Sequence, residues 1–335
     1  MNTIGYSYVK AAEFPTHGDS FGGTIEQWYA SWGTRGPRVS RILLAHLRVA
    51  RPTTRLWLDT LMPIALITAL THGAVPLRVA GLTALAMNLL HLAATLLNDV
   101  KDVETDRLSS EILRRRRPIA SGLISPRTAL VEAVACAIVG LGVTVLVRWQ
   151  LTAVTVVLAL LITQHELPPL RTQSRPIMSQ IAGLTGLVGI VTALVAAAGQ
   201  LPSGPVYFYL LFVIVYLGVG EMLVKDIRDY DNDRQGGKLT TAVKYGPAAA
   251  TAVASIAYGV AALGWVWFAA CGPVAASPGW LYAGAVILVA WVLLTVISAV
   301  QLRSSFDKAI ARRLHRGSAL VFSLTCVALL ASYVL

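Results

Sequence analysis

The chain consists of long apolar segments separated by short polar ones, and this pattern restricts it to the membrane. A helix of about 20 apolar residues crosses the hydrocarbon core of a bilayer, which is about 30 Å thick. Nine such segments lie near residues 56–74, 77–97, 128–147, 149–166, 177–199, 205–224, 247–271, 279–301 and 316–334. We therefore expect an all-α, multi-pass integral membrane protein with about nine transmembrane helices.

Composition agrees with this expectation. The 335 residues are 56% hydrophobic and 13% charged, with a mean hydropathy of +0.65, whereas a soluble globular chain is about 25% charged. The first 40 residues are polar and lack the apolar core of a signal peptide. The sequence thus predicts a polar extension over residues 1–40 and a transmembrane domain over residues 41–335.

The formal net charge of +11 follows from topology rather than from a nucleic-acid partner. Lys and Arg gather in alternate connections of the predicted spans, as in the run 114–117. The opposite connections (72–77, 200–204 and 272–278) are nearly free of Lys and Arg, with Arg148 as an exception. Loops rich in Lys and Arg stay in the cytoplasm. We expect the N-terminus and the basic loops on the cytoplasmic side of a cell membrane, and no nucleic acid as partner.

An acidic motif occurs twice, each time at the end of a predicted span. The first acidic motif is "DVKDVETDR" (99–107) and the second is "DIRDYDNDR" (226–234). Both have Asp at the first, fourth and eighth places, a basic residue at the third, an acid at the sixth and Arg at the ninth. A repeat of this kind predicts two similar half-structures.

In each motif, three aspartates fall within about 60° of one another on a helix. Their carboxylates repel one another unless a cation lies between them. Ionisable residues at membrane depth usually belong to a functional site. Oxygen ligands suit Mg²⁺, which commonly joins carboxylates to substrate phosphates. The six residues, predicted to be catalytic and metal-binding, are Asp99, Asp102, Asp106, Asp226, Asp229 and Asp233. The acids at the sixth places, Glu104 and Asp231, point off this face.

Basic residues beside the motifs could bind a diphosphate. Arg117 follows the first motif, Arg171 lies in "LPPLRTQ" (167–173), and Lys225 precedes the second motif. Arg suits bidentate phosphate contacts and Lys acts as a point charge. The alternative for each is an anchor on the cytoplasmic side of the membrane.

These motifs resemble the two signatures of the UbiA superfamily of intramembrane prenyltransferases. Residues 98–122, "NDVKDVETDRLSSEILRRRRPIASG", are similar to N-D-x-x-D-x-x-x-D followed by R-P-x-x-S-G. Residues 225–246, "KDIRDYDNDRQGGKLTTAVKYG", are similar to D-x-x-D-x-x-x-D followed by G-x-x-T and Tyr-Gly. The resemblance covers about residues 45–335. It implies nine helices around a lipid-open central cavity.

The resemblance also implies how the site works. Mg²⁺ and the two motifs, with Asn98, would bind the diphosphate of a polyprenyl donor, whose tail lies among the spans. The family's usual partner is a small, often aromatic acceptor. Relatives with such acceptors carry Y-S-x-P-P-x-R-L-K where this chain has "HELPPLRTQ", so His165 replaces Tyr and Gln173 replaces Lys. We therefore expect a neutral, electron-rich aromatic acceptor, or none.

The partner that captures the allylic cation decides between two enzymes. Transfer to an acceptor, which the resemblance favours, makes a prenyltransferase. The alternative, attack by a double bond of the same prenyl chain, makes a terpene cyclase. Three residues could assist on the acceptor side: His91, eleven positions before Asp102; Glu221, which could instead pair with Lys225; and His165. A transporter is a remote alternative. Transporters place charge near the midplane of the membrane at broken helices, whereas both acidic motifs of this chain lie at the ends of predicted spans.

Overall fold

The computed structural model describes residues 38–52, 55–74, 76–107, 117–166, 172, 175–235, 237–271 and 277–334. All longer elements in these ranges are helices, so the predicted all-α class is confirmed. In chain order they are α2 (Arg38–Ala50), η1 (Arg55–Leu61), α4 (Met62–Leu70), α5 (Leu77–Lys101), α6 (Val103–Arg107), α8 (Pro126–Val147), α9 (Trp149–Glu166), α10 (Met178–Ala198), α11 (Val206–Val215), η3 (Tyr216–Glu221), α12 (Met222–Arg228), α13 (Tyr230–Gln235), α14 (Thr241–Tyr245), α15 (Pro247–Cys271), α16 (Gly279–Gln301) and α17 (Lys308–Val334).

Seven of the described helices are long and apolar enough to cross a membrane. They correspond to seven of the predicted spans, with α11, η3 and α12 forming one continuous helix over Val206–Arg228. The remaining two predicted spans correspond to η1 with α4 and to α9, whose apolar part is the shorter Trp149–Leu161. The count of nine therefore stays a prediction.

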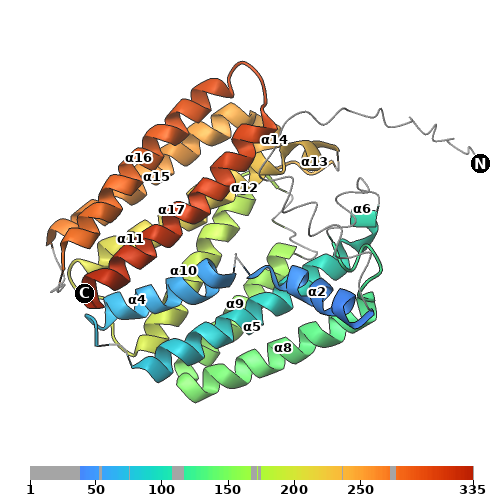
Figure 1. Cartoon of the computed structure of the whole chain (residues 1–335), viewed down its shortest axis with the longest axis horizontal. Helices are drawn as coiled ribbons and strands as arrows, with labels where there is room; N and C mark the ends of the chain where they lie inside the picture. The colour runs from blue at the N-terminus through green and yellow to red at the C-terminus, as the bar shows by residue number, and fades with distance from the viewer. Residues whose placement is uncertain are drawn as a thin grey trace, which may run out of the picture.

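The long helices form a closed ring (Figure 1). Each packs against the next along the chain, from α4 through α5, α8, α9 and α10 to α11, α15, α16 and α17. Helix α17 also packs against α4 and η1, so the last helix of the ring contacts the first. This closure brings the end of α5 and the end of α12, which carry the two acidic motifs, to the same end of the molecule.

Aromatic side chains fill the contact between α11, η3, α15 and α17. Tyr209, Phe212, Tyr216, Trp265 and Phe322 are fully buried there. The ring centroids of Phe212 lie 5.1 Å from Trp265 and 5.8 Å from Phe322, within the range of favourable aromatic pairs. This cluster fixes the helix that leads into the second acidic motif.

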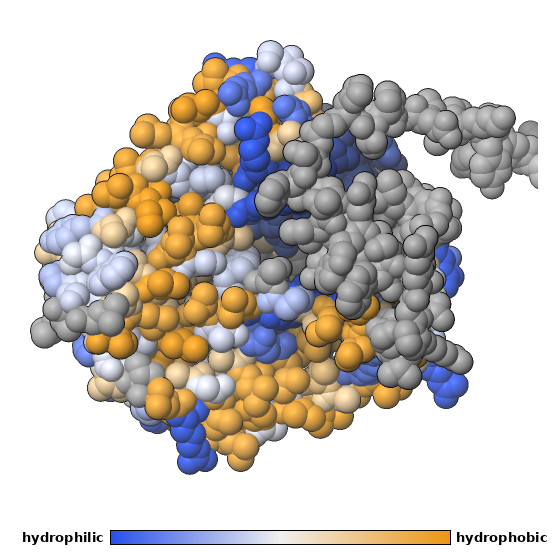
Figure 2. Space-filling model, viewed as in Figure 1, coloured by the Kyte–Doolittle hydropathy of each residue, from blue (hydrophilic) through white to orange (hydrophobic). Residues whose placement is uncertain are grey.

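The outer surface is apolar, as expected for a protein in lipid. Figure 2 shows hydrophobic side chains over most of the visible described surface. Large exposed side chains include Leu130, Ile138 and Leu160 of the first half, and Leu263 and Val286 of the second. A contiguous apolar surface of this extent is unusual in a soluble monomer. The prediction of an integral membrane protein is confirmed.

Gly264 of α15 allows α11 to approach closely, and this gives a prediction for stability. A Cβ at Gly264 would lie 2.9 Å from the Phe208 carbonyl oxygen and 3.3 Å from the Phe212 nitrogen, both backbone atoms that cannot move aside alone. We expect Gly264→Ala to lower the free energy of unfolding by about 1–3 kcal/mol. Gly259→Ala on the same helix is the control, because its Cβ would meet no atom within 4 Å. Unfolding in mixed detergent micelles measures both; equal stability would contradict the close approach.

Candidate active site

The two acidic motifs share the same backbone. Helix α5 ends at Lys101, Asp102 is its C-cap with φ −86° and ψ 4°, and α6 follows. Helix α12 ends at Arg228, Asp229 is its C-cap with φ −92° and ψ 3°, and α13 follows. Each helix is thus interrupted at the fourth place of its motif. The sequence predicted the repeat but not this interruption.

Backbone hydrogen bonds continue across each interruption, so the aspartates stay on one side. The Asp106 N–H donates to the Asp102 carbonyl at 2.8 Å, and the Asp233 N–H donates to the Asp229 carbonyl at 2.9 Å. The side chain of Glu104 points outward, with 79% of its area exposed. It accepts a hydrogen bond from Arg107 at 2.9 Å. The structure therefore separates Glu104 from the aspartates as the spacing predicted.

In the first motif, two aspartates are buried against arginines. Asp99, only 5% exposed, accepts a hydrogen bond from Arg51 at 3.1 Å. Asp106, 7% exposed, accepts one from Arg117. Asp102 is half-buried, with the Lys101 ammonium 3.9 Å away. Arg117 thus lies at the first motif and pairs with one of its aspartates.

In the second motif, Asp226 is held by α10 and α14. Its Oδ2 accepts hydrogen bonds from Gln180 Nε2 at 2.8 Å and from the Thr241 N–H at 3.3 Å. The Thr241 hydroxyl donates to Gln180 Oε1 at 2.6 Å, which completes the network. Thr241 directly follows the G-x-x-T signature, which ends at Thr240, whereas Gln180 carried no signal in the sequence.

The other acids of the second motif have basic neighbours. Arg228 donates two hydrogen bonds to Asp229, from Nε to Oδ1 at 2.8 Å and from Nη2 to Oδ2. Lys238 lies 4.0 Å from Asp233. Asp231, at the sixth place, lies 3.7 Å from Lys308 of α17, away from the other aspartates of the motif.

These surroundings shift the pKa values of Asp106, Asp233 and Asp229 in different directions. Burial raises the pKa of Asp106 above its usual value, although Arg117 opposes the shift. Burial raises the pKa of Asp233 to about 6, although Lys238 opposes the shift. Burial also acts on Asp229, but the hydrogen bonds from Arg228 outweigh it and lower its pKa. Asp229 is therefore the most firmly ionised of the three.

Arg51 contacts the first motif and lies near the second. Its Nη2 donates to Asp99, and its guanidinium is close enough to the like-charged guanidinium of Arg228 to be repelled by it. Its backbone has φ +48°, a left-handed conformation that is uncommon for residues other than glycine. Strain of this kind often occurs at functional sites. Arg51 was not among the residues that the sequence predicted to bind substrate or metal.

The donor atoms at the motifs fit Mg²⁺ that keeps part of its water shell. Among the described residues, no three His, Cys, Asp or Glu side chains converge closely enough to form a metal cage. Mg²⁺ usually binds one or two carboxylates together with water and substrate phosphates. Asn98 Oδ1 is buried beside Asp99 and has no hydrogen-bond partner in the described part of the chain. This oxygen is therefore available to bind a metal ion or to accept a hydrogen bond.

The residues proposed for the acceptor side lie in different places. His91 of α5 lies deeper in the membrane than the first motif and contacts Asp59 of η1. Glu221, 7% exposed, has its Oε1 3.0 Å from Nδ1 of His315, so its neighbour is this histidine rather than Lys225. Lys225 itself is exposed and interacts electrostatically with Asp226 and Asp229.

Two other predicted residues are not placed by the structure. His165 belongs to the last turn of α9, and its side chain lies outside the description. Arg171 lies outside the described residues.

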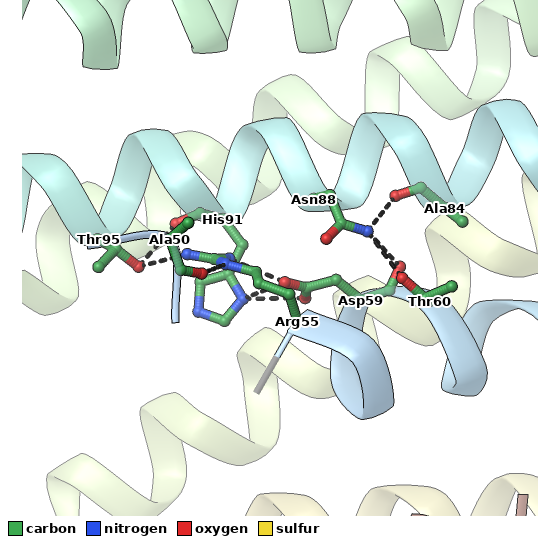
Figure 3. Close-up of polar contacts among 8 residues, drawn as sticks. All are labelled: Ala50, Arg55, Asp59, Thr60, Ala84, Asn88, His91 and Thr95. Carbon is green, nitrogen blue, oxygen red and sulfur yellow. Dashed lines mark hydrogen bonds and ion pairs between the residues drawn. The ribbon is translucent and has the colours of Figure 1, made fainter. Parts of the chain in front are cut away.

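A buried polar cluster, which was not predicted from the sequence, joins η1 to α5 (Figure 3). Arg55 Nη1 donates to Asp59 Oδ2 at 2.8 Å, and Arg55 Nη2 donates to Thr95 at 2.8 Å. His91 Nδ1 lies 2.9 Å from both oxygens of Asp59. The signal was present: Arg55 and Asp59 are charged residues four apart at the start of an otherwise apolar span.

Comparison with known proteins places this geometry in a family. The model of the UbiA prenyltransferase family matches residues 60–324. Among curated proteins, the chain is 31% identical over 160 residues to digeranylgeranylglyceryl phosphate synthase of Methanopyrus kandleri, covering 48% of this chain and 55% of that one. It is 27% identical over 187 residues to the synthase of the same name from Sulfolobus acidocaldarius, covering 53% and 62%. The chain thus matches between half and two thirds of these relatives' length.

Solved structures show the same fold. A UbiA homolog from Archaeoglobus fulgidus, bound to GPP and Mg²⁺, has a TM-score of 0.60 at 18% identity, covering 85% of this chain and 99% of that one. A UbiA homolog from Aeropyrum pernix has a TM-score of 0.57 at 20% identity, covering 77% and 95%. With the family model matching most of the chain and two interrupted acidic helices at one end of a helical ring, the chain belongs to the UbiA prenyltransferase family.

Proposed function

We propose that this protein is a Mg²⁺-dependent intramembrane prenyltransferase that ionises a polyprenyl diphosphate and transfers the prenyl group to a small acceptor. The observation that carries the proposal is the pair of interrupted acidic helices with matching C-caps, Asp102 and Asp229, at one end of the ring. The basic loops at this end support a site that opens to the cytoplasm.

The residues of the site would divide the work between metal and substrate. Asp99, Asp102, Asp226 and Asp229 are the ligands that we assign to the metal, with Asp106 and Asp233 at the ends of the motifs. When bound, Mg²⁺ supplies positive charge that stabilises a departing diphosphate. Arg117 and Lys225 stand beside the motifs and add positive charge fixed in advance, which lowers the barrier to ionisation.

Two features bear on the acceptor. The loop with His165 and Gln173 favours a neutral aromatic acceptor over an anionic one, because it lacks the lysine that would bind an anion. The name of the curated relatives, in contrast, describes a prenylated glyceryl phosphate. A phenol and a glyceryl phosphate both carry a hydroxyl group. We therefore propose a small hydroxylated acceptor, and the experiment below decides between a phenol and a glyceryl phosphate.

The test uses the purified full-length protein in nanodiscs with geranyl, farnesyl or geranylgeranyl diphosphate and Mg²⁺. Each donor is incubated without acceptor, with hydroquinone, or with a glycerol phosphate monoether, and products are identified by mass spectrometry. We expect a prenylated acceptor from at least one pair, and only slow formation of linear alcohol without acceptor. A cyclic terpene formed without acceptor, as fast as any transfer product, would replace transfer by cyclisation. No release of diphosphate from any donor would exclude both.

A further inference from the structure

Polar residues form a stripe along α5 that runs from the first acidic motif into the membrane. They recur at alternating steps of three and four, which places them on one face of the helix. Helix α8 packs against Leu89 and Leu90 on another side, and Leu85 and Leu97 are exposed about 120° from His91 in either direction. The stripe therefore faces the inside of the ring. Its members are Asn88, His91, Thr95, Asn98 and Asp102.

His91, like Asn98, has a polar atom without a hydrogen-bond partner among the described residues, whereas the polar hydrogens of Asn88 and Thr95 are used. The Asn88 amide nitrogen donates to Thr60 and to the Ala84 carbonyl at 3.0 and 2.8 Å. The Thr95 hydroxyl donates to the His91 carbonyl at 2.9 Å. His91 Nε2, in contrast, has no hydrogen-bond partner within the described ranges, and 39% of the side chain is exposed. Figure 3 shows this nitrogen on the side of the ring away from Asp59.

Asp59 determines which nitrogen of His91 carries the proton. A carboxylate only accepts hydrogen bonds, so His91 Nδ1 must be the donor, and Nε2 then has a free lone pair. Asp59 is 1% exposed and is fixed by Arg55, which also donates to the Ala50 carbonyl at 3.0 Å. A carboxylate that holds an imidazole in one tautomer and orientation prepares it to act as a general base.

The position of His91 suits an acceptor rather than the diphosphate. Eight residues of α5 separate His91 from Asp99, which corresponds to about 12 Å along the helix. The attacking oxygen of an acceptor lies about 3–3.5 Å from the carbon and about 3 Å from its base, so carbon and base are about 6 Å apart. The distance of about 12 Å between His91 and Asp99 therefore leaves room for the acceptor between His91 and the diphosphate at the acidic motif.

We propose that His91 is the general base for the acceptor and that Asp59 is its positioning residue. In this step the hydroxyl oxygen forms a bond to the allylic carbon, while the carbon–oxygen bond to the diphosphate breaks and the diphosphate leaves with the electron pair. The hydroxyl proton moves to Nε2 of His91, and the resulting imidazolium is stabilised by Asp59. This inference rests on the proposed function and narrows the acceptor to a group that loses a proton on reaction.

The second half of the molecule offers a contrast. Glu221, like Asp59, lies in a π-helical segment and has a histidine beside it, His315. However, His315 Nε2 lies 2.8 Å from Arg228 Nη1, so it accepts a hydrogen bond from the arginine that holds Asp229. His315 therefore has no free lone pair. It supports the acidic motif, whereas His91 has its lone pair available for a substrate.

The experiment measures two rates for each variant in nanodiscs. One is Mg²⁺-dependent release of diphosphate from the donor without acceptor, and the other is transfer to the hydroxylated acceptor that the wild-type protein uses. We expect His91→Gln to lower transfer by about 10²- to 10⁴-fold and to leave diphosphate release within about threefold. Asp59→Asn is expected to lower transfer with the same selectivity. Added imidazole is expected to restore part of the transfer by His91→Ala.

Two other histidines serve as comparisons. His46→Gln removes a similar histidine–acid pair, His46 Nε2 to Glu132 at 2.8 Å, and is expected to change neither rate. His315→Gln is expected to lower diphosphate release together with transfer.

The outcomes separate the inference from the proposed function. Transfer by His91→Gln at the wild-type rate would overturn the inference and leave the proposed function intact. Equal loss of both rates in a folded His91→Gln protein, judged by its unfolding midpoint, would also overturn it, because His91 would then support ionisation. If the wild-type protein transfers the prenyl group to no acceptor, the proposed function is wrong, and the role of His91 as a base for the acceptor is wrong with it.

Discussion

Alanine at the first or fourth aspartate of either acidic motif is expected to lower turnover by about a thousandfold or more. A metal ion contributes several kcal/mol to stabilising a departing diphosphate, and each 1.4 kcal/mol or so is a factor of ten in rate. These aspartates are the carboxylates that lie at or just before the helix interruptions. The variants are Asp99→Ala, Asp102→Ala, Asp226→Ala and Asp229→Ala. Diphosphate release from an allylic donor in nanodiscs measures the effect.

The acids at the sixth places are the matched controls. The side chains of Glu104 and Asp231 are 79% and 40% exposed and lie beside Arg107 and Lys308 rather than the other acids of their motifs. We expect Glu104→Ala and Asp231→Ala to retain turnover within about twofold, since exposed ion pairs contribute little. If these two variants were as inactive as the other four, the division of each motif into two faces would be wrong.

Removal of divalent metal is expected to stop diphosphate release, with less than about one hundredth of the rate left in excess chelator. Arg51, Arg117 and Arg228 neutralise part of the acidic charge, but they cannot replace a cation shared between carboxylates and phosphate. Addition of Mg²⁺ or Mn²⁺ above the chelator concentration is expected to restore the rate.

A stability measurement distinguishes loss of the metal from loss of the fold. The aromatic cluster around Phe212 and Trp265 contains none of the aspartates assigned to the metal, so the unfolding midpoint of the helical ring is expected to change little in chelator. Full turnover in excess chelator would refute the assignment of a metal to the aspartates.

The sequence was sufficient for the elements and the motifs because both are local patterns. Apolar segments of about 20 residues predict spans, and the spacing of Asp99, Asp102 and Asp106 predicts a shared face. The resemblance of the two motifs to known signatures then predicted the family, which the family model confirms over residues 60–324. None of this required contacts between distant parts of the chain.

The partners of these residues could not be predicted, because they depend on how the ring closes. Asp226 is held by Gln180 from α10, and Glu221 lies beside His315 from α17. Arg55 and Asp59 could be recognised as a charged pair at the start of an apolar span, but the contact of Asp59 with His91 depends on where η1 meets α5. The π-helical form of η1 and η3 could not be predicted from the sequence either, because one extra residue in a helical turn leaves no compositional signal.

The closed ring also has a consequence for how the protein is inserted into the membrane. Synthesis proceeds from the N-terminus, so α4 and α5 enter the bilayer before α17 exists. A charged residue at the centre of a span costs about 2.5–3.5 kcal/mol on insertion, and Arg55 and Asp59 offset this within a single helical turn. Glu221 has no salt-bridge partner in its own helix within the described ranges, and its partner His315 arrives only with α17. Assembly of the second half is therefore the late step of biogenesis, and a nascent chain stopped before α17 should be recognised by membrane quality control through the unpaired charge of Glu221.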